Sequence, residues 1–149
     1  MIKVLIPLNI KNKNGRIYTK ENIEPCVQDF IYRINNNGPI FGQIDHPDSF
    51  DISLSKASHI IKNIWFENNN LVGEITPLTT YYGKQLKELI SSGVYFSVRP
   101  RSIGFVDING YVQLEKIITF DIILSIHDSF YDIRKIRLDK LSKLNILSE

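Results

Sequence analysis

Three separate parts of the sequence carry residues that could take part in acid–base or nucleophilic chemistry. The first, "GQIDHP" at 42–47, places His46 between an aspartate and a proline. A histidine is the usual general base near neutral pH because its unperturbed pKa is about 6.5. Pro47 restricts His46 to extended backbone conformations, so a rigid turn would hold the imidazole. On these local features alone, a turn histidine that only caps or packs is the simpler interpretation.

The second part is "VYFSVRPRSIG" at 94–104. In a strand, Ser97, Arg99 and Arg101 would share one face. A serine nucleophile could then lie beside arginines that stabilise a developing oxyanion. The alternative is a solvated or partner-facing strand edge, because Pro100 cannot donate a hydrogen bond to a central ladder.

The third part is Asp121, an acidic residue inside the apolar segment "ITFDIIL". Burying a carboxylate is costly unless it has a partner. A histidine would be a suitable partner, since a carboxylate can orient and stabilise an imidazole, as in hydrolase triads. Asp121 could also point to solvent on an alternating strand, and the sequence alone leaves both interpretations open.

The remaining histidines and the single cysteine do not predict a metal site. His59 lies inside a predicted strand, where we expect it to be half-exposed, and His127 lies in a predicted turn. Neither has a second histidine at ligand spacing, and Cys26 alone offers neither an intramolecular disulfide nor a cysteine-based zinc site. We therefore expect no structural or catalytic metal.

The composition indicates an ordinary soluble domain. The chain has 149 residues, of which 43% are apolar, enough for one sizeable core. A net charge of +2 is too small to argue for nucleic-acid binding. The apolar start of the chain is too short to span a membrane and no cleavage-site pattern follows it, so we expect an intracellular protein.

Strands outnumber helices in the predicted order of elements. Apolar and alternating segments predict strands at 3–10, 39–44, 57–67, 71–78, 94–98, 102–108 and 111–124. Helices are predicted at 19–38, with Thr19 as N-cap, and at 81–93, which Gly93 ends. The fold class is therefore α+β, a β-rich barrel or curled antiparallel sheet with flanking helices.

Two parts of unequal size are expected. Residues 1–128 form the main domain, and residues 129–149 form a C-terminal amphipathic helix in which a narrow leucine seam lies among basic residues. Such a helix would cap the domain core or dock on a partner protein. The seam is too narrow to favour membrane contact.

Five segments, in the same order, resemble motifs of the prohead (procapsid) maturation serine proteases of tailed phages. That family shares its fold with the herpesvirus assembly proteases. The segments are "NKNGRIYTKENIEPCVQDFI", "GQIDHP", "SHIIKNIWFENNNLVGEI", "LISSGVYFSVRPRSIGFV" and "ITFDIIL". The resemblance implies that His46 holds the general-base position and that Asp121 is the acidic third member of a triad. It implies no cofactor.

The nucleophile position departs from the family's Ser-Ser-Arg pattern. An ungapped match puts Arg99 and Pro100 on the serine pair and Arg101 on the following arginine. A shift of two residues puts Ser97 on the family's serine and keeps the same strand face. Ser97 is thus the candidate nucleophile, Arg99 and Arg101 are the candidate oxyanion groups, and Ser102 is a weaker candidate nucleophile.

The resemblance implies a serine endopeptidase that cuts scaffold, core and major capsid proteins inside an assembling prohead in the host cytoplasm. It also implies a homo-oligomer. Because of the departure at Arg99 and Pro100, the alternative is a catalytically inactive virion component with a protease fold. A nucleic-acid module using the Arg99 and Arg101 face is disfavoured, because no recognisable motif accompanies these arginines.

Overall fold

The computed structural model describes residues 1–45, 47, 49–124 and 145–147. The described residues form two helices, seven strands and one short 3-10 helix, Leu54–Lys56. In chain order these are β1 (Ile2–Pro7), α1 (Lys20–Asn37), β2 (Ile40–Gln43), β3 (Ala57–Glu67), β4 (Asn70–Pro77), α2 (Tyr81–Ser91), β5 (Phe96–Val106), β6 (Val112–Leu124) and β7 (Asn145–Leu147). The predicted α+β class is confirmed. Neither described helix combines the length and apolar character needed to cross a bilayer.

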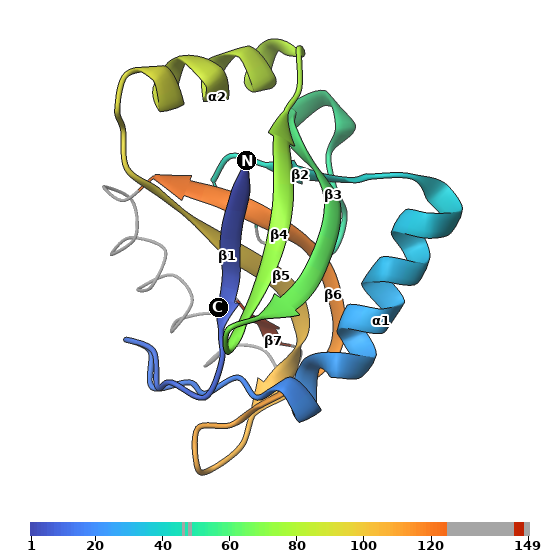
Figure 1. Ribbon diagram of the computed structural model, residues 1–149, viewed down its shortest axis with the longest axis vertical. Helices are drawn as coiled ribbons and strands as arrows, with labels where there is room; N and C mark the ends of the chain where they lie inside the picture. Colours follow the sequence, from blue (N-terminus) through green and yellow to red (C-terminus); the bar gives the residue numbers. More distant parts are fainter. Residues whose placement is uncertain (46, 48, 125–144, 148–149) are drawn as a thin grey trace.

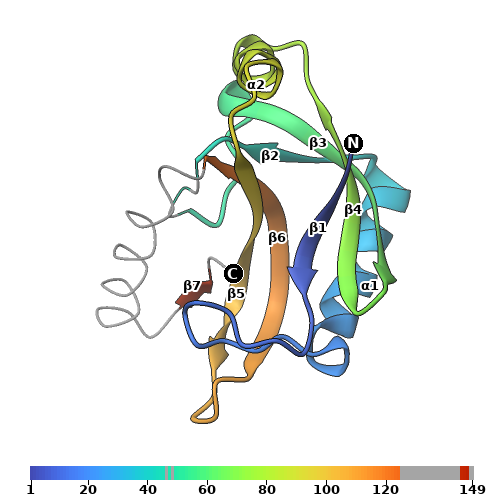
Figure 2. The same ribbon diagram turned by 60° about the vertical axis from the view of Figure 1, so that its left-hand side comes forward.

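Two antiparallel sheets curve around one core (Figures 1 and 2). One has the strand order β1-β4-β3-β2 and the other the order β6-β5-β7. They are joined where β2 ends, because Ile44 bridges to Ile122 in parallel and the Asp45 N–H donates to the Ile122 carbonyl at 2.8 Å. On the opposite side, β1 runs next to β5. Helix α1 covers one flank of the sheets and α2 lies across one end (Figure 1).

Helix α1 begins where the sequence predicts. The Thr19 hydroxyl accepts the Asn22 N–H at 3.2 Å, which caps an otherwise unpaired donor of the first turn. Its apolar stripe is buried against β6, and Phe30 meets Phe120 edge to face with ring centroids 5.3 Å apart. The helix therefore fixes β6, the strand that carries Asp121.

Strand β5 runs straight through Pro100, although the sequence predicted two strands separated at 99–101. The carbonyls of Phe120 and Ile122 point away from β5, because they accept hydrogen bonds from His59 and Asp45. Pro100 lies opposite Phe120, and such non-hydrogen-bonded pairs alternate with bonded ones in an antiparallel ladder. The nitrogen of Pro100 therefore faces away from β6, and the proline costs the ladder no bond.

The predicted C-terminal helix falls mostly outside the described residues, as does His127. Its described portion, Asn145–Leu147, is strand β7, which pairs antiparallel with Ser102–Gly104 of β5. The helix prediction is therefore wrong for residues 145–147. The reason is that the unpaired edge of β5 offers backbone hydrogen bonds, which local leucine periodicity cannot reveal.

His59 is fully buried, so the expectation of a half-exposed strand residue is wrong. Its Nε2 donates to the Phe120 carbonyl at 2.8 Å, and its Nδ1 accepts the Ser58 hydroxyl at 2.8 Å. A carbonyl can only accept, so this geometry requires the neutral tautomer with the proton on Nε2. Gly42 leaves room for the ring, because a Cβ there would lie 2.1 Å from His59 Nε2. The imidazole thus ties β3 to β6.

Stability should fall as the pH drops below about 6.5, because burial lowers the pKa of His59 in the folded state. Its bond to Phe120 and the field of Asp121 act in the opposite sense but are smaller. The unfolded chain then binds a proton that the folded chain does not, so the free energy of unfolding decreases as the pH falls below about 6.5. Urea unfolding of the wild type and His59→Gln across this range measures the effect. Parallel pH profiles for the two proteins would contradict it.

Candidate active site

A buried ion pair lies at the centre of the region that the sequence singled out. Arg101 and Asp121 are both completely inaccessible to solvent. Nε of Arg101 lies 2.9 Å from Oδ2 of Asp121, and Nη2 lies 3.0 Å from Oδ1, which makes the pair bidentate. The interpretation of Asp121 as a solvent-facing residue is therefore wrong, and so is that of this strand face as solvated.

The guanidinium of Arg101 uses all five of its N–H groups within the fold. Besides the three bonds to Asp121 and Gln43, its Nη1 donates to the carbonyls of Ser49 and Asp51, at 3.2 and 2.7 Å. An arginine has only five such donors. In this arrangement Arg101 has none to offer an oxyanion, and its expected role there is corrected to a structural one.

Gln43 completes the cluster from the strand that precedes His46. Its side chain is buried, and Oε1 accepts from Arg101 Nη2 at 3.2 Å and from the Ser53 N–H at 3.0 Å. Its own backbone N–H donates to Asp121 Oδ1 at 3.1 Å. The cluster therefore holds the chain on both sides of the 44–52 loop.

The backbone next to His46 has a definite position. Asp45 takes a left-handed conformation with φ of 65°, which Asp tolerates better than most residues because its short side chain can hydrogen-bond locally. Its N–H is bound to the Ile122 carbonyl, immediately after Asp121 in β6. His46 itself lies outside the described residues, so its distance to Ser97 Oγ remains a prediction.

Ser97 and Arg99 share the strand face that the sequence predicts. Ser97 pairs with Ile123 and Arg99 with Asp121, whereas Phe120 and Ile122 point the other way into the core. No described group lies within hydrogen-bonding distance of Ser97 Oγ, although this atom is buried. Ser102 Oγ shares this property, so what distinguishes Ser97 is the cavity beside it and not the missing partner alone.

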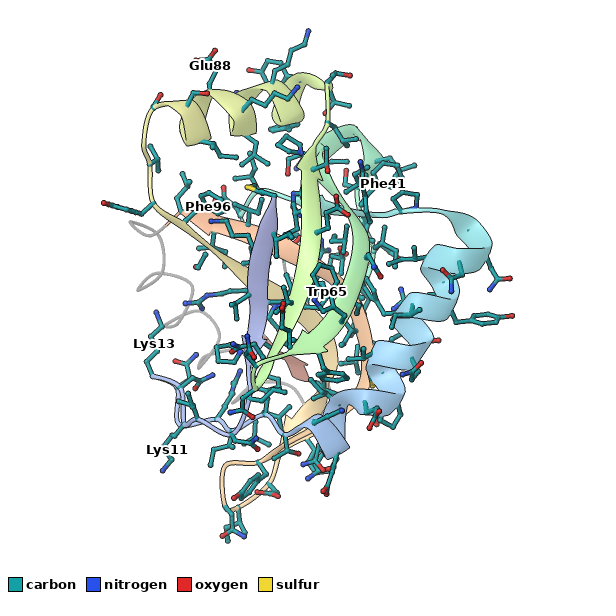
Figure 3. All side chains as sticks on the ribbon, in the orientation of Figure 1. Lys11, Lys13, Phe41, Trp65, Glu88 and Phe96 are labelled. Carbon is teal, nitrogen blue, oxygen red and sulfur yellow. The ribbon has the colours of Figure 1, made fainter. Side chains whose placement is uncertain are left out.

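A cavity of about 460 Å³ adjoins this hydroxyl. It lies along the seam between β1 and β5, with Leu5–Pro7 on one side and Ser97–Pro100 on the other. Lys13, on the loop after β1 (Figure 3), and Tyr18 also line it. Next to the cavity, Phe96 begins β5 beneath the Nζ of Lys3, which lies 4.6 Å from the ring centroid. Ser97 and Arg99 thus meet at a site large enough for a side chain of a ligand.

Two other serines are worse placed for chemistry. Ser102 is fully buried and lies five residues further along β5, about 15 Å from Ser97. Ser58 is hydrogen-bonded to His59, but both residues are completely buried. A substrate cannot reach either of them.

Sequence reasoning missed Gln43 and the backbone groups of the 49–53 loop. A buried arginine has more donors than one carboxylate can accept, and that excess signals further acceptors, but it does not say where they lie. The one signal in the sequence was that Gln43, a residue with a side-chain acceptor, lies three residues before His46. Within the described ranges, no three metal-binding side chains gather at one place.

Comparison with known proteins agrees with the fold. The family model described as "Prohead core protein serine protease" matches residues 2–131. The prohead core protein protease of Enterobacteria phage T4 is 24% identical over 103 residues, covering 68% of this chain and 49% of that protein. The chain thus spans about half the length of that curated relative. The solved structure of the bacteriophage T4 capsid assembly protease, gp21, is similar with a TM-score of 0.74 and 22% identity, covering 84% of this chain and 81% of that one.

Asp121→Asn should destabilise the fold by about 3–5 kcal/mol, because it leaves the buried Arg101 guanidinium without its counter-charge. Thr119→Val is the matched control on the same strand face. It removes only a neutral hydrogen bond to the Phe41 carbonyl and should cost about 1 kcal/mol. Urea denaturation of both variants measures the difference. Equal losses would show that the charge of Asp121 does not matter for stability.

Proposed function

The chain belongs to the prohead core protein serine protease family, and on that premise we propose that it is a serine endopeptidase of phage head maturation. Its substrates are scaffold or core proteins and capsid proteins, cut within the prohead as it assembles in the host cytoplasm. The names of its relatives, a prohead core protein protease and a capsid assembly protease, support this substrate class.

The observation that carries the proposal is the alignment of three segments across β6. Asp45, next to His46, is bound to Ile122, while Ser97 lies opposite Ile123 and Arg99 opposite Asp121. Adjacent strands are about 4.8 Å apart, so the backbones of Asp45 and Ser97 are about 10 Å apart, with β6 between them. Side chains of a histidine and a serine reaching over β6 from its two sides can meet across this separation.

In the proposed mechanism, Ser97 Oγ attacks the scissile carbonyl while His46 takes the serine proton. His46 then returns this proton to the leaving amine, and water hydrolyses the acyl-enzyme by the same steps. Asp121 orients and stabilises the imidazole. Three hydrogen bonds from Arg101 and Gln43 hold the Asp121 carboxylate in place on the side of β6 where Asp45 precedes His46.

Arg99 is the arginine that we assign to the developing oxyanion. It lies two residues from Ser97 on the same strand face and lines the same cavity. At 4% exposure it is shielded from water, which strengthens its interaction with a developing negative charge. This assignment replaces the shared role that the sequence suggested for Arg99 and Arg101.

The alternative is an inactive family member that serves as a virion component. It is favoured by the ungapped match, in which Arg99 and Pro100 occupy the serine pair. In that match Arg101 falls on the arginine of the Ser-Ser-Arg pattern, and its buried, structural position fits this assignment. It does not identify the residue that acts as the nucleophile. A shift of two residues retains the strand face, so Ser97 stays available for catalysis.

Ser97→Ala should abolish both labelling by a fluorophosphonate probe and cleavage of the core protein co-expressed from the same phage. The probe reacts with activated serines whatever the cleavage specificity, and mass spectrometry locates the label. Ser102→Ala is the control. It removes a buried hydroxyl for which no described group is a partner, so folding and activity should persist.

Wild-type labelling at Ser97, lost only in Ser97→Ala, is the expected result. An unlabelled wild type together with an uncut core protein would reject the protease assignment and favour the inactive virion component. Labelling at another serine would reject Ser97 as the nucleophile.

A further inference from the structure

The amide of Gln43 closes the loop that contains His46. Its Oε1 accepts the N–H of Ser53, ten residues further along the chain, at 3.0 Å. The same oxygen accepts from Arg101, and Arg101 in turn binds the carbonyls of Ser49 and Asp51 inside the loop. The guanidinium of Arg101 therefore holds the backbone at Ser49 and Asp51, and one side-chain oxygen connects Gln43 with Ser53.

Gln43 Oε1 is the acceptor for two donors, the Ser53 N–H and Arg101 Nη2, in a buried part of the protein. Gln43 is 5% exposed and Arg101 is not exposed at all. Without Oε1, an N–H of Arg101 and the N–H of Ser53 would lose their acceptor together. Both would have to move to find another, and the loop would move with them.

Gln43 also contacts the proposed acid of the triad. Its backbone N–H binds Asp121 Oδ1, while its side chain bonds the arginine that is paired with Asp121. A neutral amide at this position satisfies Arg101 without adding a second negative charge beside Asp121. A small displacement of a catalytic group can cost about 100-fold in rate, so the placement of this loop bears directly on the reaction.

We propose that Gln43 is a positioning residue, which sets the place of the His46 loop relative to Asp121 and Ser97 by closing it onto Ser53 and Arg101. It touches neither substrate nor reacting atoms. The proposal rests on the proposed protease function for its kinetic consequence, but not for its structural one.

Two variants break the same hydrogen bond from opposite sides. Gln43→Met removes the acceptor and keeps the approximate size of the side chain. Ser53→Pro removes the donor, and the φ of Ser53, −81°, is compatible with proline. Ser53→Ala is the matched control, because it deletes the hydroxyl that contacts Ser55 and keeps the N–H.

The measurement is the rate of fluorophosphonate labelling of Ser97 as a function of probe concentration and pH. We expect Gln43→Met and Ser53→Pro to lower the maximal rate about 10- to 100-fold, with the half-saturating concentration changed less than about twofold. The acid limb of the pH profile, which reports the general base, should shift in both. Ser53→Ala should match the wild type.

The NMR titration of the His46 imidazole, assigned with His46→Gln, separates this proposal from the protease assignment. If the wild type is not labelled, a titration that moves in Gln43→Met and Ser53→Pro still supports positioning. The positioning role of Gln43 is rejected if the folded variants are labelled at the wild-type rate. Where the wild type is not labelled, it is rejected if the His46 titration is the same in the variants as in the wild type. Should Gln43→Met fail to fold, Ser53→Pro decides alone.

Discussion

The site depends on one buried bidentate ion pair. Taking a guanidinium and a carboxylate out of water is expensive, and their attraction repays the cost only if the remaining donors and acceptors are also satisfied. Arg101 and Asp121 meet this condition through Gln43 and through two carbonyls of the 49–51 segment. The requirement to satisfy five donors therefore fixes the backbone at Ser49 and Asp51, which lies outside any helix or strand.

The same requirement explains why the two sheets meet where they do. The end of β2 lies against β6 through Gln43 and Asp45, and β3 reaches β6 through His59. These contacts are polar and specific, so they fix the register between the sheets more narrowly than apolar packing would. Helix α1 then packs its apolar stripe on the far side of β6, whose residues 117–123 are all buried.

The sequence predicted local structure well and long-range polar contacts poorly. The Thr19 cap and the apolar segments at 57–67 and 71–78 are local signals, so the start of α1 and the strands β3 and β4 could be predicted. The partners of Arg101 come from positions 20 to 58 residues away, and periodicity carries no information about them. His59 was misjudged for the same reason, because its acceptor, the Phe120 carbonyl, lies on another sheet. The shared face of Ser97 and Arg99 was predicted correctly, since alternation alone determines it, whereas the sequence left the environment of Asp121 open.

The proline in β5 has a consequence for the shape of the whole molecule. The seam between β1 and β5 is bordered by Pro100 on one strand and Pro7 on the other, and both line the cavity. Each lacks the N–H that a continuous ladder would use at its position. In the described part of the chain, β1 pairs only with β4, and β5 only with β6 and β7. The two sheets therefore do not close into a continuous barrel between β1 and β5. Ser97 lies at the edge of this opening, where it lines the cavity.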